Sequence, residues 1–188
     1  GGDETCSLTL TNCTFTGNTT DYGSGGGMMC GGNTTLTNCT FTNNSANGNG
    51  GGMYNSSSSS PTLTGCTFTN NTANEGGGMY NSGRLMMTNC TFENNHSTSN
   101  WSYDGGGGMM WNFVEDIVED SNPTLTDCTF TGNIADGNGG GIGMRANNYN
   151  LNPPILENCT FTNNTAYRGG GMLSTGYYSN PTLTDCTF

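Results

Sequence analysis

Apolar and polar residues alternate in short runs that recur along the whole chain. In the stretch 61–80, PTLTGCTFTNNTANEGGGMY, threonines flank Leu63 and Phe68, and Cys66 lies between them. Alternation in segments rich in β-branched and aromatic residues predicts half-buried β-strands with these three side chains inward. Leucine and cysteine are three residues apart rather than two, so we expect a bend at Gly65, and at Asn, Asp or Gly in the other repeats.

The Cys-Thr-Phe core marks the repeat. It begins at Cys13, Cys39, Cys66, Cys90, Cys128, Cys159 and Cys186, at intervals of 26, 27, 24, 38, 31 and 27 residues. Such periods indicate a solenoid. Three short strands and three bends per repeat predict an all-β parallel β-helix. We expect one solenoid over 1–188 with about seven coils, roughly 29 Å long at about 4.8 Å per coil, and loop expansions at 96–104, 111–122 and 145–153.

Two further columns follow each cysteine. Five residues on lies an asparagine, and stacked amides predict a ladder of hydrogen bonds along the axis: Asn18, Asn44, Asn71, Asn95, Asn133 and Asn164. A run of glycines and a methionine then predicts a third strand that another backbone approaches closely.

These elements resemble a known family. Phe-Thr-Asn-Asn-Thr-Ala followed by Gly-Gly-Gly-Met, at 68–79 and 161–172, is similar to the repeat of the polymorphic outer-membrane proteins, with its F-x-x-N and G-G-A-[ILV] elements. The resemblance implies a right-handed parallel β-helix on a cell surface or secreted, as an adhesin stalk or passenger domain.

The amino-acid composition limits the classes of molecule that the chain is expected to bind. The chain has three Lys and Arg residues, fourteen Asp and Glu residues and a formal net charge of −11, which argues against nucleic acid as a partner. We expect no membrane span, because there is no long apolar run. The sequence begins and stops within a repeat, so we expect a piece of a longer array or a subunit that associates end to end or laterally into fibres.

Cysteines and sequons favour an extracellular or cell-surface place. Cys6 and Cys30 lie at matching places before the first two repeats, and we expect a disulfide between them, whereas the other seven cysteines form an inward column. Of twelve Asn-x-Ser/Thr sequons, Asn18 and Asn95 belong to the ladder and should be inaccessible. Glycans could project at Asn33, Asn43, Asn55, Asn70, Asn100 and Asn163.

The longest interval holds the main departure from the repeat. We expect exposed aromatic residues there and in corresponding later loops to form a site for sugars or proteins: Trp101, Tyr103, Trp111, Phe113, Tyr149, Tyr177 and Tyr178. The acidic run of Glu115, Asp116, Glu119 and Asp120 could bind Ca²⁺, although a solvated acidic loop explains it as well. No other cofactor is expected.

Two more functions are open. Many β-helices cleave polysaccharides, but Arg84, Arg145, Arg168 and His96 are single residues in different repeats, so we expect no catalysis. The Thr-x-Thr array resembles ice-binding β-helices. The sequence therefore favours a structural stalk, adhesin or filament module, with a carbohydrate-binding adhesin as the alternative and an enzyme or ice-binding protein as less favoured readings.

Overall fold

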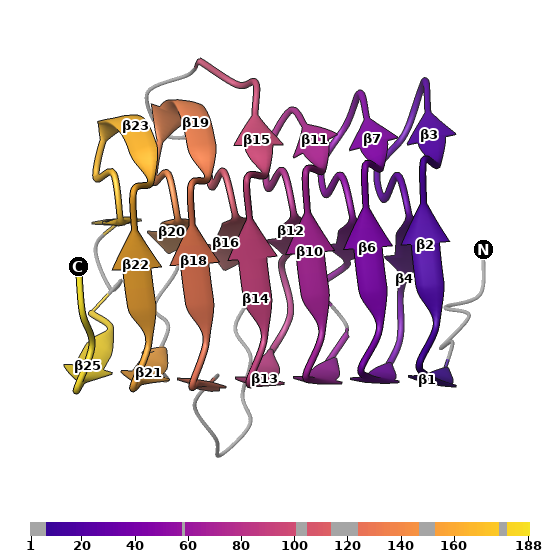
Figure 1. Ribbon diagram of the computed structural model, residues 1–188, viewed down its shortest axis with the longest axis horizontal. Coiled ribbons are helices and arrows are strands. Elements are labelled where there is room, and N and C mark those ends of the chain that lie inside the picture. Colours follow the sequence, from indigo (N-terminus) through magenta and orange to yellow (C-terminus); the bar gives the residue numbers. More distant parts are fainter. Residues whose placement is uncertain (1–6, 58, 101–104, 114–123, 147–152, 177–179) are drawn as a thin grey trace.

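The structure is a computed structural model that describes residues 7–57, 59–100, 105–113, 124–146, 153–176 and 180–188. For Phe113 and Ala146 it describes the backbone alone. Within these residues the chain forms strands β1 to β25 and no helix. The strands stack into a rod whose axis runs from the N-terminal to the C-terminal coil (Figure 1). Accordingly, no helix in the described part is long and apolar enough to cross a membrane.

The strands belong to four parallel sheets. Sheet A holds β1 (Thr9–Thr11), β5 (Thr35–Thr37), β9 (Thr62–Thr64), β13 (Met86–Thr88), β17 (Thr124–Thr126), β21 (Ile155–Glu157) and β25 (Thr182–Thr184). Sheet B holds β2 (Thr14–Thr16), β6 (Thr40–Thr42), β10 (Thr67–Thr69), β14 (Thr91–Glu93), β18 (Thr129–Thr131) and β22 (Thr160–Thr162). Sheet C holds β3 (Thr19–Thr20), β7 (Ser45–Ala46), β11 (Thr72–Ala73), β15 (His96–Ser97), β19 (Ile134–Asn138) and β23 (Thr165–Arg168). Sheet D holds β4 (Met28–Cys30), β8 (Met53–Asn55), β12 (Met79–Asn81), β16 (Met109–Phe113), β20 (Ile142–Ala146) and β24 (Met172–Gly176).

Each coil contributes one strand to every sheet, so the fold is the expected parallel β-helix. Six coils are complete, from β1–β4 to β21–β24, and β25 begins a seventh. A coil has four short strands rather than three, because a bend before the ladder asparagine separates the strands of sheets B and C. Strands β15, β16 and β20 occupy parts of the expected loop expansions: 96–97, 111–113 and 145–146 are strand.

Left-handed backbone produces the two tight bends of each coil. The bend between sheets A and B has positive φ at Gly65 and at Asn or Asp in the described coils around it, for example 52° at Asn38. The bend between sheets B and C does the same, with 56° at Asn70. Glycine, asparagine and aspartate are the residues that tolerate this conformation, so the expected bend positions are confirmed.

The apolar columns fill the interior. Leu63, Cys66, Phe68 and Met79 are all fully buried, and their equivalents in neighbouring coils form one continuous core. The phenylalanines stack face to face along the axis, from Phe15 to Phe188, with ring centroids 4.6–5.0 Å apart and planes within 8° of parallel. The spacing of these rings matches the distance of about 4.8 Å between neighbouring strands.

The glycine runs precede the strands of sheet D, which begin at the methionine after the glycines or, in β20, at Ile142. The sequence had predicted that the glycines themselves form the strand. In one such run Gly76 has φ of 64°. A Cβ on Gly78 would lie 2.5 Å from the carbonyl oxygen of Gly108 and 2.9 Å from the ring of Phe92. Glycine is therefore required here by close approach of backbone and core, as expected.

The asparagine ladder is confirmed in the interior coils. The side-chain oxygen of Asn71 accepts from the backbone N–H and the side-chain amide of Asn44, at 2.9 and 3.0 Å. The amide of Asn71 donates to the carbonyl of Phe41 and to Asn95, both at 2.9 Å. The same pattern continues to Asn164. Asn95 is buried as predicted, whereas Asn18, in the first coil, is exposed, so the prediction that it is inaccessible is wrong.

Candidate functional surface

Sheet B presents two rows of outward threonines. The first row pairs in register at successive coils without interruption: Thr14, Thr40, Thr67, Thr91, Thr129 and Thr160, which bridges to Thr187. Strand pairing places hydroxyls about 4.8 Å apart along the axis, and the two rows lie roughly 6.6 Å apart across each strand. Because β-branched side chains have few rotamers in a strand, the array is stiff.

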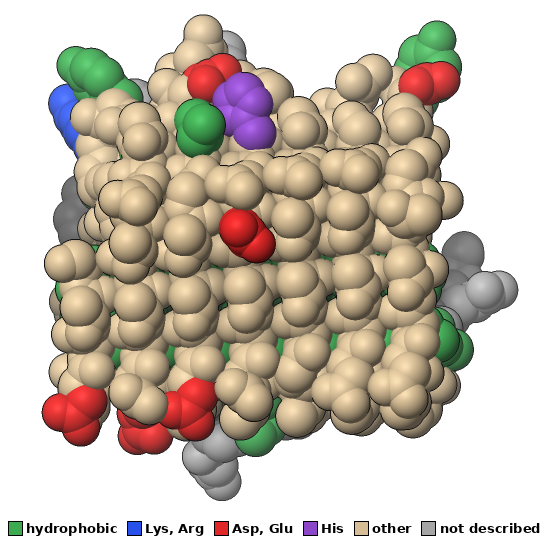
Figure 2. Space-filling view, viewed as in Figure 1, with side chains coloured by type: hydrophobic (Ala, Val, Ile, Leu, Met, Phe, Trp, Pro, Cys, Tyr) green, Lys and Arg blue, Asp and Glu red, His purple; other side chains and the backbone are tan. Residues whose placement is uncertain are grey.

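The second row has one break. Glu93 occupies the register position between Thr69 and Thr131. In Figure 2, one acidic side chain lies near the middle of this face, and the other charged side chains lie toward its edges. Sheet A continues the pattern with Thr-Leu-Thr strands, although Met86 and Ile155 replace its threonines in two coils. Sheet B therefore carries the more regular threonine surface.

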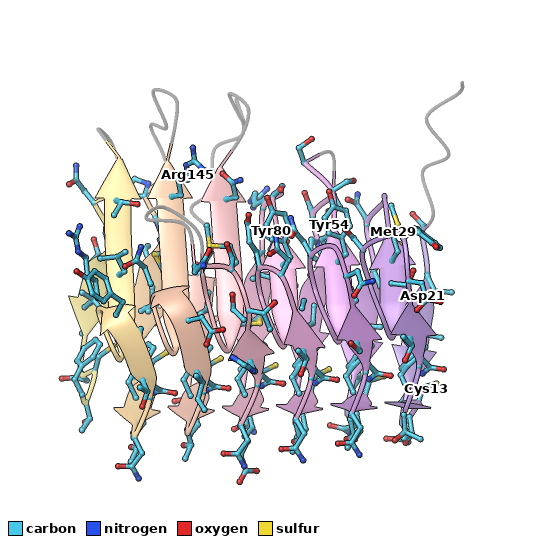
Figure 3. The ribbon with its side chains drawn as sticks, turned by 90° about the horizontal axis from the view of Figure 1, so that it is seen from above. Cys13, Asp21, Met29, Tyr54, Tyr80 and Arg145 are labelled. Atoms are coloured by element: carbon cyan, nitrogen blue, oxygen red, sulfur yellow. The ribbon has the colours of Figure 1, made fainter. Side chains whose placement is uncertain are left out.

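Sheet D carries an outward apolar row that the sequence analysis missed. Met29, Tyr54, Tyr80 and Met110 are in register on successive coils, and Figure 3 shows the first three along one side of the rod. The rings of Tyr54 and Tyr80 stack at 5.3 Å. Met29 is 66% exposed, whereas Tyr80 is buried, and burial raises the pKa of its phenol. The recurrence of Met-Tyr after the glycines was the available signal.

One pair of ionisable side chains meets on sheet C. His96 Nε2 lies 2.9 Å from Asp136 Oδ1 on the next coil, and both side chains are substantially exposed. The sequence predicted His96 to be a single residue and gave no sign of its pairing with Asp136. Asp21 occupies the equivalent position to Asp136 in the first coil, so the two carboxylates do not converge. Among the described residues, no three His, Cys, Asp or Glu side chains form a group that could hold a metal.

Trp111 is not part of an exposed aromatic site. It lies in β16, has 0% exposure and packs in the core cluster. The register explains this: Trp111 pairs with Asn81 and Met144 at an inward position, two residues after the inward Met109. The prediction that it contacts ligands is therefore wrong.

The other predicted aromatic and acidic ligands cannot be placed. Phe113 ends β16, and only its backbone is described. The remaining members lie outside the described residues: Trp101, Tyr103, Tyr149, Tyr177, Tyr178, Glu115, Asp116, Glu119 and Asp120. The hypotheses that the aromatic residues bind sugars and that the acidic residues bind Ca²⁺ stay predictions.

The predicted glycan positions divide into two groups. Asn33, Asn43, Asn70, Asn100 and Asn163 are exposed. Asn55 is 0% exposed and its amide points toward Asn81 in the next coil, at 3.4 Å. A glycan cannot project from it in this fold, so the prediction for Asn55 is wrong. Its position two residues after the inward Met53 was the signal that places it inside.

The cysteine column is confirmed as an interior feature. Five of its thiols are buried and those of Cys13 and Cys186 are partly exposed, and all seven are free of disulfides. The expected bond between Cys6 and Cys30 stays a prediction, because Cys6 lies outside the described residues. Cys30 is buried, and its sulfur accepts a hydrogen bond from the Thr34 hydroxyl at 2.8 Å.

Comparison with known proteins identifies a fold family. A family model described as a right-handed beta helix region matches residues 2–188. No curated protein and no solved structure matches the chain.

Proposed function

Because this chain belongs to the right-handed β-helix family, we propose that it is a structural module of an extracellular or cell-surface protein, a stiff rod that serves as a stalk or filament element. The observation that carries the proposal is the continuity of the interior stacks through every coil. The phenylalanine stack runs from Phe15 to Phe188 and the amide ladder from Asn18 to Asn164. The stacked rings and the amide hydrogen bonds both join each coil to the next. Contacts between neighbouring coils are what stiffen a solenoid.

The resemblance to outer-membrane-protein repeats and the exposed sequons support a surface location. We propose that rods associate end to end, because an added coil from the same or another chain would continue all four sheets. Among the described strands, β25 pairs with β21 alone, at one end of sheet A. Leu183 of β25 continues the inward leucine column and is 41% exposed.

Concentration-dependent sedimentation and electron microscopy test the association. We expect fibres of uniform width from the unchanged chain. Leu183→Glu places a charge in the column where the next coil would stack, and we expect it to abolish fibres. Thr182→Glu, at the exposed neighbouring position of the same strand, is the matched control and should leave them intact. A chain that stays a discrete rod at all concentrations would contradict end-to-end assembly.

One specific observation favours a second function, ice binding. The sheet B threonines form a stiff, in-register lattice of hydroxyl and methyl groups without charge except at Glu93. A periodic surface of this kind can order water against it, whereas a charged surface would disrupt such order. Thermal hysteresis and inhibition of ice recrystallisation measure the activity directly.

Two substitutions with opposite expected effects on ice-binding activity make this test more specific. Glu93→Thr completes the second row and should increase the activity, and Thr67→Tyr on the unbroken row should remove most of it. Thr72→Tyr, on an outward position of sheet C, is the control and should have little effect. Absence of activity in both the unchanged chain and Glu93→Thr would exclude ice binding.

A further inference from the structure

We propose that the interior cysteine column binds soft metal ions, each held in linear coordination between thiolates of two successive coils. The column consists of one cysteine from every coil: Cys13, Cys39, Cys66, Cys90, Cys128, Cys159 and Cys186. Its role as metal site is separate from the proposed structural function and does not depend on it.

The spacing of the column fits a metal bridge better than a disulfide. The phenylalanine two residues after each cysteine repeats at 4.6–5.0 Å along the axis, and the inward cysteines follow the same coil repeat. A disulfide needs Cβ atoms about 3.5–4.5 Å apart and sulfurs at about 2.05 Å. Two metal–sulfur bonds of about 2.3 Å in line span about 4.6 Å. The coil repeat is therefore close to the second distance.

The thiols of the column make only weak contacts with the backbone. The thiol of Cys90 lies 3.7 Å from the carbonyl oxygen of Leu63 and 3.5 Å from that of Thr88. Likewise, the thiol of Cys66 donates to the carbonyl groups of Leu36 at 3.7 Å and of Thr64 at 3.6 Å. Thiols are weak hydrogen-bond donors. Replacing these hydrogen bonds by metal–sulfur bonds therefore costs little stability.

The side chains around the cysteine column limit how many protein ligands a bound metal ion can have. Buried leucine and phenylalanine flank the sulfurs, and within the described chain no three His, Cys, Asp or Glu side chains converge as a metal site. Ions that require three or four side-chain ligands are therefore disfavoured. Thiolates select soft ions, and among these a two-coordinate ion is satisfied by two neighbouring coils.

Charge favours a divalent ion in this apolar core. Binding breaks two S–H bonds, forms two metal–sulfur bonds and releases two protons to solvent, with no change of oxidation state. With a mercuric ion the bridged unit is neutral, whereas a monovalent ion would leave one negative charge buried at high cost. Because Cys13 and Cys186 are partly exposed, the pairs that contain them are the expected points of entry.

The test compares two variants with the same number of thiols. Both start from Cys6→Ala with Cys30→Ala, which removes the cysteines outside the column. In the contiguous variant, Cys128, Cys159 and Cys186 are also replaced by alanine, which leaves four adjacent thiols that include the partly exposed Cys13. In the alternating variant, Cys39, Cys90 and Cys159 are replaced instead, which leaves four thiols with no neighbours.

Each folded variant is loaded with mercuric chloride, and the ions retained against excess glutathione are counted. We expect about two ions per chain in the contiguous variant, one for each pair of thiolates, and essentially none in the alternating variant. Equal retention by the two variants would overturn the proposal. X-ray absorption on the chain lacking only Cys6 and Cys30 provides a measurement that does not depend on the folding of the variants. A shell of two sulfurs supports the site, and a shell with nitrogen, oxygen or more sulfurs refutes it.

Discussion

Replacing one interior ladder asparagine tests whether the amide column holds the coils together. In Asn71→Ala, four side-chain hydrogen bonds disappear: two accepted from Asn44, one donated to Phe41 and one donated to Asn95. The backbone N–H of Asn71 keeps its bond to Asn95 at 3.0 Å. The damage therefore lies mainly on the side of Asn44, whose backbone N–H and one amide hydrogen lose their acceptor in a buried site.

The magnitude follows from these two orphaned donors. A buried unsatisfied donor costs about 1–3 kcal/mol, so Asn71→Ala should lower the free energy of unfolding by about 2–6 kcal/mol. Domains of this kind are stable by only about 5–15 kcal/mol, and the loss is thus a large part of the total. Chemical denaturation followed by circular dichroism measures it, and hydrogen exchange shows whether the coils of Asn44 and Asn71 open first.

Two controls separate the ladder from general effects of substitution. Asn74→Ala makes the same change three residues later, on an exposed side chain, and should cost under about 0.5 kcal/mol. Asn18→Ala removes an exposed member that donates to Asn44, and should cost about 0.5–1.5 kcal/mol. Equal costs for Asn71→Ala and Asn74→Ala would refute the claim that the amide column stabilises the stack.

Four further outcomes follow from burial and close packing. Trp111→Ala should lower stability by about 3–5 kcal/mol in a denaturation experiment, and glycan-array binding, if any, should be unchanged per folded molecule. Gly78→Ala, whose Cβ would meet backbone at 2.5 Å, should cost at least about 1–3 kcal/mol, whereas Gly31→Ala, with its nearest contact at 3.6 Å, should be tolerated. The hydrogen bond with Cys90 and burial raise the pKa of the Cys66 thiol above its ordinary value of 9.0. Unfolded chains ionise this thiol near that pH and folded chains do not, so stability should fall as pH rises past about 9, with a smaller slope in Cys66→Ala. In a secretory host that attaches N-glycans, peptide mapping of the folded protein should find sugar at Asn70 and none at Asn55; glycan at Asn55 would contradict its burial.

The sequence predicted those features of the fold that repeat in every coil. Alternation around Leu63 and Phe68 identified the inward columns, and the constant distance from cysteine to asparagine identified the ladder. These positions could be read because each coil presents the same residue type in the same place, and stacking makes equivalent residues neighbours. The bend at Gly65 followed from its offset of leucine and cysteine. Turn residues with left-handed backbone confirm it.

Positions that depend on where a strand begins could not be read in the same way. The glycine run was taken as strand, so the inward positions after the methionine were not followed along sheet D. Trp111 and Asn55 are both two residues after an inward first methionine, at 109 and 53, and both are buried. Side chains in a strand alternate between faces, so the methionine would have placed both inside had the strand start been known. The pairing of His96 with Asp136 depends on register between coils separated by the longest interval, which sequence spacing alone did not resolve.

The different uses of polar groups in the interior and on the surface are consistent with the structural role proposed above. Catalysis requires groups that are held near the reacting atoms and left available for chemistry. In the described chain the buried amides of Asn44, Asn71 and Asn95 bond to the coils on either side, so they are used for cohesion. The feature that repeats on the surface is the threonine lattice, which offers position and shape rather than an ionisable group. Under the two proposals above, this surface would contact another periodic surface, either a second rod or ordered water. The effect of Glu93→Thr on fibre packing and on ice growth would therefore distinguish which of the two it contacts.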